Sequence, residues 1–359
     1  MINGHGGNVY EWARHMDCPL DEIIDMSSNI NPLESPPQLL DSLKENIHLI
    51  HRLPEVDNKS LIRTFAAFYD KHIDQVTCGP GTTDFIYHLP EILNTKKVLI
   101  IGPTYADYAD ACSRHMIDIN YLIADVSNTF SPELNSQDFN AVDTVFICNP
   151  NNPTGHFISS FQLRDICKQY PDVRFIIDES YLHFSLDYDD ETMIRSGLNN
   201  VIVLCSFSKI FAIPGLRLGF MVANKDVINH FRKKEKPWNV NSLAQIAGTF
   251  LFDNMLEVQN FIQKTARHIQ TEKQRCQDTL AQYKHIQLFG SFSPFILIQL
   301  PNDLPSENVC TQLAQKKYLV RNCSNFYGLS DHYIRIAFKD TDTNKELLNH
   351  LTGIFSNQS

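Results

Sequence analysis

The chain of 359 residues carries a formal net charge of −10, and 43% of its residues are hydrophobic. This length allows two domains, or one large α/β domain with an appendage, and the apolar content is sufficient for a sizeable buried core. The negative charge argues against a general nucleic-acid binder, although an acidic protein can still contain a locally positive site for an anionic substrate.

The nine cysteines are scattered along the chain, and no Cys-x-x-Cys pair occurs. Most of them lie in apolar runs and are expected to be small core residues, so we predict neither a disulfide framework nor a metal site. No basic segment followed by an apolar run stands at the N-terminus, and no stretch approaches the roughly 18 apolar residues of a membrane span. We therefore expect a cytoplasmic protein without a membrane or nucleic-acid partner.

Residues 1–37 are rich in glycine, asparagine and proline, which favours an arm over a packed domain. A short helix is expected at 9–16, and amphipathic patterns predict further helices over 38–49 and around 61–69.

A glycine turn at 79–81 leads into a helix that should end near Leu93, with Thr82 or Thr83 as its N-cap. A glycine turn, two hydroxyls and a helix N-terminus are typical of an anion site, because free backbone N–H groups and the helix dipole face the ligand. A plain capped helix would show the same residues, so the motif alone does not separate the two interpretations.

Four apolar runs are predicted to be buried strands, at 98–101, 144–148, 174–177 and 201–205. Helical stretches lie between them, which indicates a mainly parallel sheet covered on both faces. Each run ends in a polar motif, and open α/β sheets bind ligands at the carboxyl ends of their strands. We therefore expect one site where these four ends meet.

The pattern changes after Asn241. Further on, the sequence predicts a long amphipathic helix at 256–283, two strands at 295–300 and 333–338, and two more helices at 307–316 and 343–355. These elements indicate a smaller α+β domain, with the long helix linking the two domains. We expect the chain to divide into an N-terminal arm at 1–37, a large domain at 38–250 and a small domain at 251–359.

The motif after the fourth run holds Ser206, Ser208, Lys209 and Arg217 in one turn. A lysine beside an arginine suits a dianionic phosphate and a carbonyl that can form an imine. Taken alone, the same residues are more typical of an ordinary charged surface loop.

Taken together, the strand ends carry an Asn-Pro-Thr-Gly segment at 152–155, Asp178 three residues before Tyr181, Tyr105 after a proline, and the Ser-x-Ser-Lys…Arg motif. This set resembles the fold type I, pyridoxal-phosphate-dependent aminotransferase superfamily over nearly the whole chain. The resemblance implies an α/β fold, with a large domain on a mainly parallel seven-stranded sheet and a smaller α+β domain. It also implies pyridoxal 5′-phosphate as cofactor and a homodimer.

The resemblance further implies a role for each of these residues. Lys209 would bind the cofactor aldehyde as an imine, and Asp178 would pair with the pyridinium nitrogen and keep the ring electron-withdrawing. Asn152 and Tyr181 would hydrogen-bond the phenolic oxygen, and Tyr105 would stack on the ring. The cofactor phosphate would be held by a further set of groups, from Gly81, Thr82, Thr83, Ser206, Ser208 and Arg217. Lys209, Asp178 and Tyr181 are the expected catalytic residues.

Within the superfamily, the chain resembles the threonine-phosphate decarboxylases of cobalamin biosynthesis and, somewhat less closely, the histidinol-phosphate aminotransferases. The segments that carry this resemblance lie outside the cofactor motifs, at 5–8 (His-Gly-Gly-Asn), 27–33, 237–245, 321–329 and 333–337. The implied substrate is an O-phosphorylated α-amino acid, which is decarboxylated.

Such a substrate needs a carboxylate site and a second anion site. The resemblance implies that Arg335 binds the carboxylate, with help from Asn152 and the backbone near Ile30, since a guanidinium matches a carboxylate bidentately. Arg321 and His5 are the candidates for the substrate phosphate, with Asn8 and Asn31 nearby.

Two residues depart from the pattern of the resembled enzymes. Leu53 stands where an Arg-Tyr-Pro tyrosine would reach the cofactor phosphate of the neighbouring subunit, and Thr82 or Thr83 are candidates for replacing that contact. Many of the decarboxylases have phenylalanine at the position of Tyr181, whereas a tyrosine there is typical of the aminotransferases.

Three questions stay open at this point. A histidinol-phosphate aminotransferase is the nearest alternative, and a non-catalytic cofactor-binding regulator is a distant one, because no helix-turn-helix module is visible. Threonine phosphate and serine phosphate differ by one methyl group, which a pocket discriminates by only about 1–3 kcal/mol.

Overall fold

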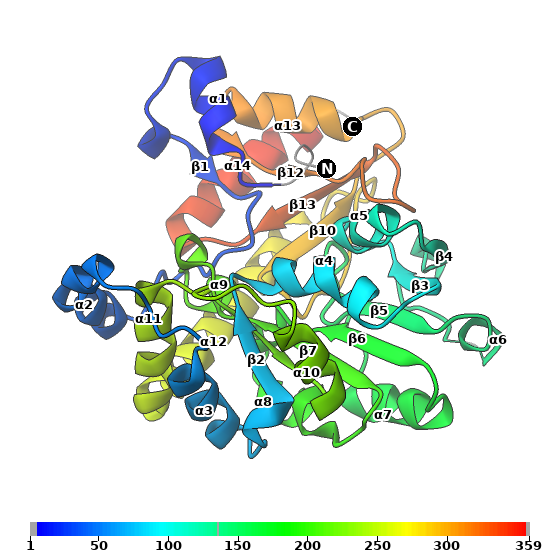
Figure 1. Cartoon of the computed structure of the whole chain (residues 1–359). Coiled ribbons are helices and arrows are strands. Elements are labelled where there is room, and N and C mark those ends of the chain that lie inside the picture. Colours follow the sequence, from blue (N-terminus) through cyan, green and yellow to red (C-terminus); the bar gives the residue numbers. More distant parts are fainter. Residues whose placement is uncertain (1–5, 135, 357–359) are drawn as a thin grey trace.

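The computed structural model describes residues 6–134 and 136–356 of the chain (Figure 1). Its largest element is a seven-stranded sheet with the strand order β2-β8-β7-β6-β5-β3-β4. The strands are β2 (Val76–Gly79), β3 (Lys97–Gly102), β4 (Asp118–Ile123), β5 (Thr144–Cys148), β6 (Arg174–Asp178), β7 (Val201–Ser206) and β8 (Gly219–Val222). Neighbouring strands from β4 to β7 run parallel, whereas β8 is antiparallel to both β7 and β2. The prediction of a mainly parallel sheet is confirmed.

Helices cover this sheet on both faces, as uniformly apolar strands require. The helices of this part of the chain are α2 (Pro37–Glu45), α3 (Lys59–Phe68), α4 (Thr82–Ile92), α5 (Asp107–Arg114), α6 (Ser136–Phe139), α7 (Ser160–Gln169), α8 (Tyr188–Glu191), α9 (Phe207–Ile210), α10 (Lys225–Arg232) and α11 (Ser242–Asp253). In Figure 1, α4, α5 and α10 lie in front of the sheet, and α2 and α3 pack beside α11 at its edge.

A second, smaller group of elements lies above this sheet in Figure 1. It contains a four-stranded sheet of β12 (Arg321–Asn322), β13 (Tyr333–Ala337), β10 (Phe295–Gln299) and β9 (Gln287–Leu288), with α13 (Ser306–Ala314) and α14 (Thr341–Ser356). The arm joins it, because β1 (Ile24–Asp25), which follows α1 (Val9–Met16), pairs in parallel with β11 (Tyr318–Leu319).

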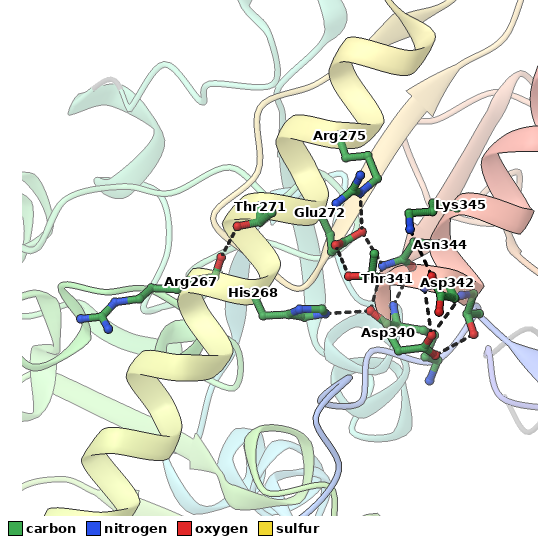
Figure 2. Close-up of polar contacts among 12 residues, drawn as sticks. Arg267, His268, Thr271, Glu272, Arg275, Asp340, Thr341, Asp342, Asn344 and Lys345 are labelled. Atoms are coloured by element: carbon green, nitrogen blue, oxygen red, sulfur yellow. Dashed lines mark hydrogen bonds and ion pairs between the residues drawn. The ribbon is translucent and has the colours of Figure 1, made fainter.

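The long helix α12 (Met255–Leu280) contacts both groups. Its predicted apolar face is confirmed, since Ile262, Ile269, Cys276 and Leu280 are buried. A buried polar cluster attaches it to the N-terminus of α14 (Figure 2). Glu272 accepts hydrogen bonds there from Thr341 Oγ1 (2.7 Å), Asn344 Nδ2 (3.0 Å) and Arg275 Nε (3.2 Å).

Two local predictions are wrong. The expected helix at 38–49 is broken at Asn46, whose Nδ2 donates to the Ser42 carbonyl (2.8 Å), and residues Ile47–His51 continue as a 3-10 helix. Neither Thr82 nor Thr83 caps α4: the N-cap is Gly81, at φ 88°, and Thr82 is the first helical residue. A positive φ costs glycine little, so the chain turns at Gly81 and leaves the helix N-terminus without a side-chain cap.

All nine cysteines are free thiols, and seven of them are buried, in agreement with the prediction of core residues. Among the described helices, none combines the length and apolar character needed to cross a membrane.

Candidate active site

A cavity of about 200 Å³ lies where the carboxyl ends of the large sheet face the small sheet and the arm. The arm contributes Gly6, Ser27, Ser28, Asn29 and Ile30; the large sheet contributes Tyr105, Ala106, Asn152, Tyr181 and Lys209; the small sheet contributes Arg321, Asn325, Phe326 and Arg335. Seven residues that the sequence predicted for cofactor or substrate therefore line one pocket, although they are spread over 306 positions, from Ile30 to Arg335.

Lys209 lies on α9, directly after β7, and its Nζ is 5.2 Å from the centre of the Tyr181 ring. The Lys209 carbonyl accepts a hydrogen bond from the backbone N–H of Asn31 (3.0 Å). Ser206 and Ser208, on the same turn, are buried. The turn thus presents the amine to the pocket while its backbone is held by the arm.

Asp178 ends β6 and is buried. One carboxylate oxygen accepts from the Ser180 N–H (3.0 Å) and hydroxyl (2.5 Å), and the other accepts from the Tyr108 hydroxyl (2.8 Å). Burial raises the pKa of Tyr108 well above its usual value, so Tyr108 stays a donor. These bonds fix the carboxylate and satisfy its charge.

A cradle for an anion lies at the N-terminus of α4. A Cβ atom placed on Gly81 would come within 2.6 Å of Arg217 Nη2, and one placed on Gly219 would come within 2.7 Å of the Thr82 nitrogen. Only glycine therefore lets the guanidinium approach the turn, beside a helix N-terminus that no side chain caps. Thr82 is buried and Thr83 half-buried at this place. The donor set fits the phosphate of pyridoxal phosphate, and Asp178 and Lys209 fit its ring nitrogen and its aldehyde.

The tyrosine and asparagine predicted for the cofactor also have defined partners. The Tyr181 hydroxyl accepts from Asn29 Nδ2 (2.9 Å), and Asn152 Oδ1 accepts from Arg335 Nη1. Tyr105 is half-buried in the pocket wall, and burial raises its pKa.

Arg321 and Arg335 are directly opposite each other on the antiparallel strands β12 and β13. Opposite residues of such a pair point to the same face of the sheet, and both arginines line the pocket. Arg335 Nη2 donates to the Ser27 carbonyl (2.6 Å), while Arg335 Nε is buried and has no partner among the described residues. Burial lowers the pKa of both guanidiniums.

Two predicted residues of the arm, Asn8 and Asn31, do not line this pocket. Asn31 is buried and turned away from it, since its Nδ2 donates to the Ile210 carbonyl (2.5 Å) and to Thr265 Oγ1 (3.0 Å). Asn8 is exposed and hydrogen-bonded to Glu11. His5 lies outside the described residues.

The sequence did not single out several residues that shape the pocket. Asn151 links its own loop to the turn before Tyr105. Its Nδ2 donates to the Pro103 carbonyl (2.8 Å), and its Oδ1 accepts from Thr104 Oγ1 (2.7 Å). Asn29 and Tyr108 hold Tyr181 and Asp178, respectively. Asn29 lies within the segment 27–33 and Asn151 directly precedes the Asn-Pro-Thr-Gly segment, but only the folded chain shows which asparagine faces which partner.

The comparison with protein families decides the class. The model of the class I and II aminotransferases matches residues 21–351. The chain belongs to this family. Its members depend on pyridoxal phosphate, so the predicted cofactor is confirmed at the level of the family, and the protein is an enzyme of the pyridoxal-phosphate-dependent aminotransferase fold.

Individual relatives include both of the resembled groups. The threonine-phosphate decarboxylase of Salmonella typhimurium is 28% identical, with 98% of each chain covered. The adenosylcobalamin biosynthesis bifunctional protein CobDQ of Leptospira interrogans is 29% identical over 98% of this chain, which spans only 41% of that longer protein.

Solved structures of both groups of enzymes are also similar to this chain. That of L-threonine-O-3-phosphate decarboxylase from Porphyromonas gingivalis has a TM-score of 0.82 and 26% identity, and covers 93% of this chain and 100% of its own. That of the histidinol-phosphate aminotransferase from Clostridium acetobutylicum has a TM-score of 0.83 and 27% identity over the same shares.

Proposed function

We propose that the enzyme decarboxylates an O-phospho-L-amino acid. The preferred substrate is L-threonine O-3-phosphate, which yields (R)-1-aminopropan-2-yl phosphate for the nucleotide loop of a cobamide; L-serine O-phosphate, which yields ethanolamine phosphate, is the second candidate. The observation that carries the proposal is the arginine pair. Like charges directly opposite on a sheet repel, and both guanidiniums lose hydration by burial, so a substrate with two anionic groups would stabilise both Arg321 and Arg335.

The substrate carboxylate is assigned to Arg335. Its unpaired Nε and a neighbouring Nη can donate together to two carboxylate oxygens, in the planar arrangement that guanidinium and carboxylate share. The substrate phosphate is assigned to Arg321, beside Asn325, whose Oδ1 accepts from Arg321 Nη2 (2.6 Å). Of the neighbours predicted for that phosphate, Asn8 and Asn31 do not line the pocket, and only His5, which lies outside the described residues, stays a prediction.

The cofactor side is assigned to Lys209, Asp178 and the cradle of Gly81, Thr82 and Arg217, with Tyr105, Asn152 and Tyr181 around the ring. When bound, pyridoxal phosphate supplies an electron-accepting ring that stabilises negative charge at the substrate α-carbon. Arg335 holds the carboxylate until the bond from the α-carbon breaks and carbon dioxide leaves. Lys209, whose amine lies in the same pocket, would then supply the proton that the α-carbon takes up.

Histidinol-phosphate aminotransferase is the second candidate function. Relatives of that name favour it, as does Tyr181 in place of a phenylalanine. Histidinol phosphate carries a phosphate but no carboxylate, so it would leave one of the two arginines without an anionic partner. The second substrate of an aminotransferase, a dicarboxylate such as 2-oxoglutarate, would occupy both arginines, so the products decide between the two functions.

Product analysis tests the proposal. Holoenzyme is incubated with L-threonine phosphate, with L-serine phosphate, and with histidinol phosphate plus 2-oxoglutarate, and the products are identified by mass. Carbon dioxide and the phosphorylated amino alcohol are expected from one of the first two. A 2-oxo acid product without carbon dioxide would refute the decarboxylase.

We also propose a homodimer in the cytoplasm. The segment after α2 exposes three large apolar side chains, Ile47, Ile50 and Leu53, with exposed fractions of 50%, 59% and 74%. Leu53 also lines a separate cavity of about 480 Å³ beside α11, which contains none of the predicted cofactor or substrate residues. An apolar surface of this kind suits a second copy of the chain. Light scattering should give twice the chain mass of 41.2 kDa; a monomer at micromolar concentration would contradict the dimer.

A further inference from the structure

The loop 323–329, here named the substrate loop, lies between β12 and β13. One part of it faces the pocket, and another part contacts the large sheet. Asn325 and Phe326 line the pocket, and the Arg321 guanidinium lies 4.9 Å from the centre of the Phe326 ring. The following residues, Tyr327 and Gly328, instead contact β4, the edge strand of the large sheet. The loop therefore connects the substrate side of the pocket to a strand that belongs to the cofactor side.

The docking contact consists of a ring stack and a close approach. The Tyr327 and Tyr121 rings are stacked, with centres 4.2 Å apart and an interplanar angle of 29°. Tyr121 and Ile123 are two residues apart on β4 and so point to the same face. A Cβ atom on Gly328, at φ 93°, would lie 2.7 Å from Ile123 Cγ2, so only glycine fits there.

Ile123 also touches the turn that carries Tyr105. A Cβ atom on Gly102 would lie 2.8 Å from Ile123 Cδ1. The Ile123 side chain is thus enclosed by two glycines, Gly102 from the large sheet and Gly328 from the substrate loop. Ile123 thereby lies against both the strand end before Tyr105 and the substrate loop.

We propose that Tyr121 and Ile123 are positioning residues for substrate binding: they dock the substrate loop and so hold Asn325, and through it Arg321, at the place of the substrate's second anionic group. Neither side chain lines the pocket, so each acts through the loop. The inference rests on the proposed function, since it takes Arg321 as the group that binds that anion.

The loop can lose this contact without unfolding, which makes the proposal testable. Backbone bonds from Phe326 N–H to the Cys323 carbonyl (3.0 Å) and from Leu329 N–H to the Phe326 carbonyl (2.9 Å) shape it internally. Cys323 and Phe326 are buried in a small core cluster that joins residues of the C-terminal sheet to Ala124 and Phe130, which follow β4. Removing a ring of the stack should therefore free the tip of the loop and leave its base in place.

The first test is kinetic and uses Tyr121→Ala, Tyr327→Ala and the double variant as holoenzymes. Each single variant should raise KM for the phospho amino acid about two- to tenfold, the range that an aromatic pair supports, with kcat changed less than about twofold. The double variant should be no worse than the worse single one, because both remove the same contact. Tyr121→Phe keeps the ring and should behave as the unmodified enzyme. Phe161→Ala, which removes an exposed ring on α7, is the control for general surface effects.

An unchanged KM in both single variants, or effects that multiply in the double variant, would overturn the proposal. A second test separates its failure from that of the proposed function. Amide hydrogen exchange at 323–329 is measured on holoenzyme without substrate, and should be faster in Tyr121→Ala than in Phe161→Ala. Unchanged exchange refutes the docking whatever the substrate, whereas faster exchange in an enzyme that acts on neither phospho amino acid refutes only the assignment of Arg321.

Discussion

The two sides of the pocket are built from different parts of the chain. On the cofactor side, Asp178 ends β6, Lys209 follows β7 and Arg217 precedes β8. These strands are adjacent in the large sheet, and the three residues lie within 40 positions of one another. On the substrate side, the bond from Arg335 to the Ser27 carbonyl joins positions 308 residues apart. The cofactor side is built on strands that are close to one another in the sequence. The substrate side forms only when the two ends of the chain have packed together.

This difference separates two kinds of change. A substitution on the substrate side mainly alters contacts of the arm and of the small sheet, and reaches the proposed cofactor residues through few bonds, such as that from Arg335 Nη1 to Asn152 Oδ1. Such an arrangement lets related enzymes keep one cofactor site while they exchange substrates, which agrees with the two groups of relatives found for this chain. The four predictions below test how complete the separation is.

The largest effect is expected on the cofactor side, from Lys209→Ala. Loss of the amine should lower activity by about three orders of magnitude or more and remove the absorbance of lysine-bound cofactor, because no other lysine lines the pocket among the described residues. Absorbance spectra after dialysis check this. Lys168→Ala, an exposed lysine of α7, is the matched control, and a band that persists in Lys209→Ala would refute the assignment.

On the substrate side, Arg335→Lys should raise KM about 10- to 100-fold and leave the cofactor absorbance unchanged. Lysine keeps the charge but loses the planar pair of donors, a loss of about 1.5–3 kcal/mol for hydrogen bonds to a charged group. Steady-state kinetics with the phospho amino acid measure the effect, and Arg267→Lys on the surface of α12 is the control. Loss of cofactor from Arg335→Lys would show that the two sides are not separable.

The same difference between the two sides of the pocket explains which parts of the site could be predicted from the sequence. The strand ends with Asp178 and Lys209 were predictable because uniformly apolar runs give buried parallel strands, and their polar ends then meet at one edge. The strands β2, β4 and β8 were not predicted. β4 is an edge strand whose side chains are only partly buried, and β2 and β8 are each four residues long, so none of them gives a long apolar run.

Which asparagine does what could not be predicted either. Asn29 and Asn31 are two residues apart in one motif, yet one holds the Tyr181 hydroxyl and the other donates to the Ile210 carbonyl. The direction of each side chain depends on how the irregular arm crosses the large sheet, and no period in the sequence encodes that path. The docking of Tyr327 on Tyr121 depends in the same way on long-range packing.

A smaller effect is expected at the junction in Figure 2, from Glu272→Gln. Burial opposes ionisation of Glu272, but hydrogen bonds from Thr341, Asn344 and Arg275 outweigh it, so its pKa lies below the usual value of 4.5. The carboxylate therefore stabilises the folded protein above about pH 4.5, and this contribution is lost as the pH falls through the lowered pKa. The variant should lose about 1–3 kcal/mol of unfolding free energy at pH 7.

Urea unfolding at pH 7 and near pH 4 measures this. The gap between Glu272→Gln and the unmodified protein should shrink at the lower pH, while the cofactor absorbance at pH 7 stays the same. An equal gap at both values would mean that the charge of Glu272 contributes nothing. A changed absorbance would mean that the junction of α12 and α14 also shapes the cofactor side.

The smallest effect is expected from Thr265→Val, which tests the link between the sides most directly. Thr265 on α12 is fully buried, and its hydroxyl accepts from the same Asn31 amide that donates to the Ile210 carbonyl beside Lys209. Valine keeps the shape, and Asn31 keeps its other bond, so kcat should fall by only about two- to tenfold, with KM unchanged. Thr271→Val, whose hydroxyl donates to the Arg267 carbonyl at the surface of the same helix, is the control. If kcat is the same in both variants, the arm supports the turn of Lys209 through its backbone bond alone; if KM rises instead, Asn31 acts on the substrate side, and the division of the pocket shifts to include it there.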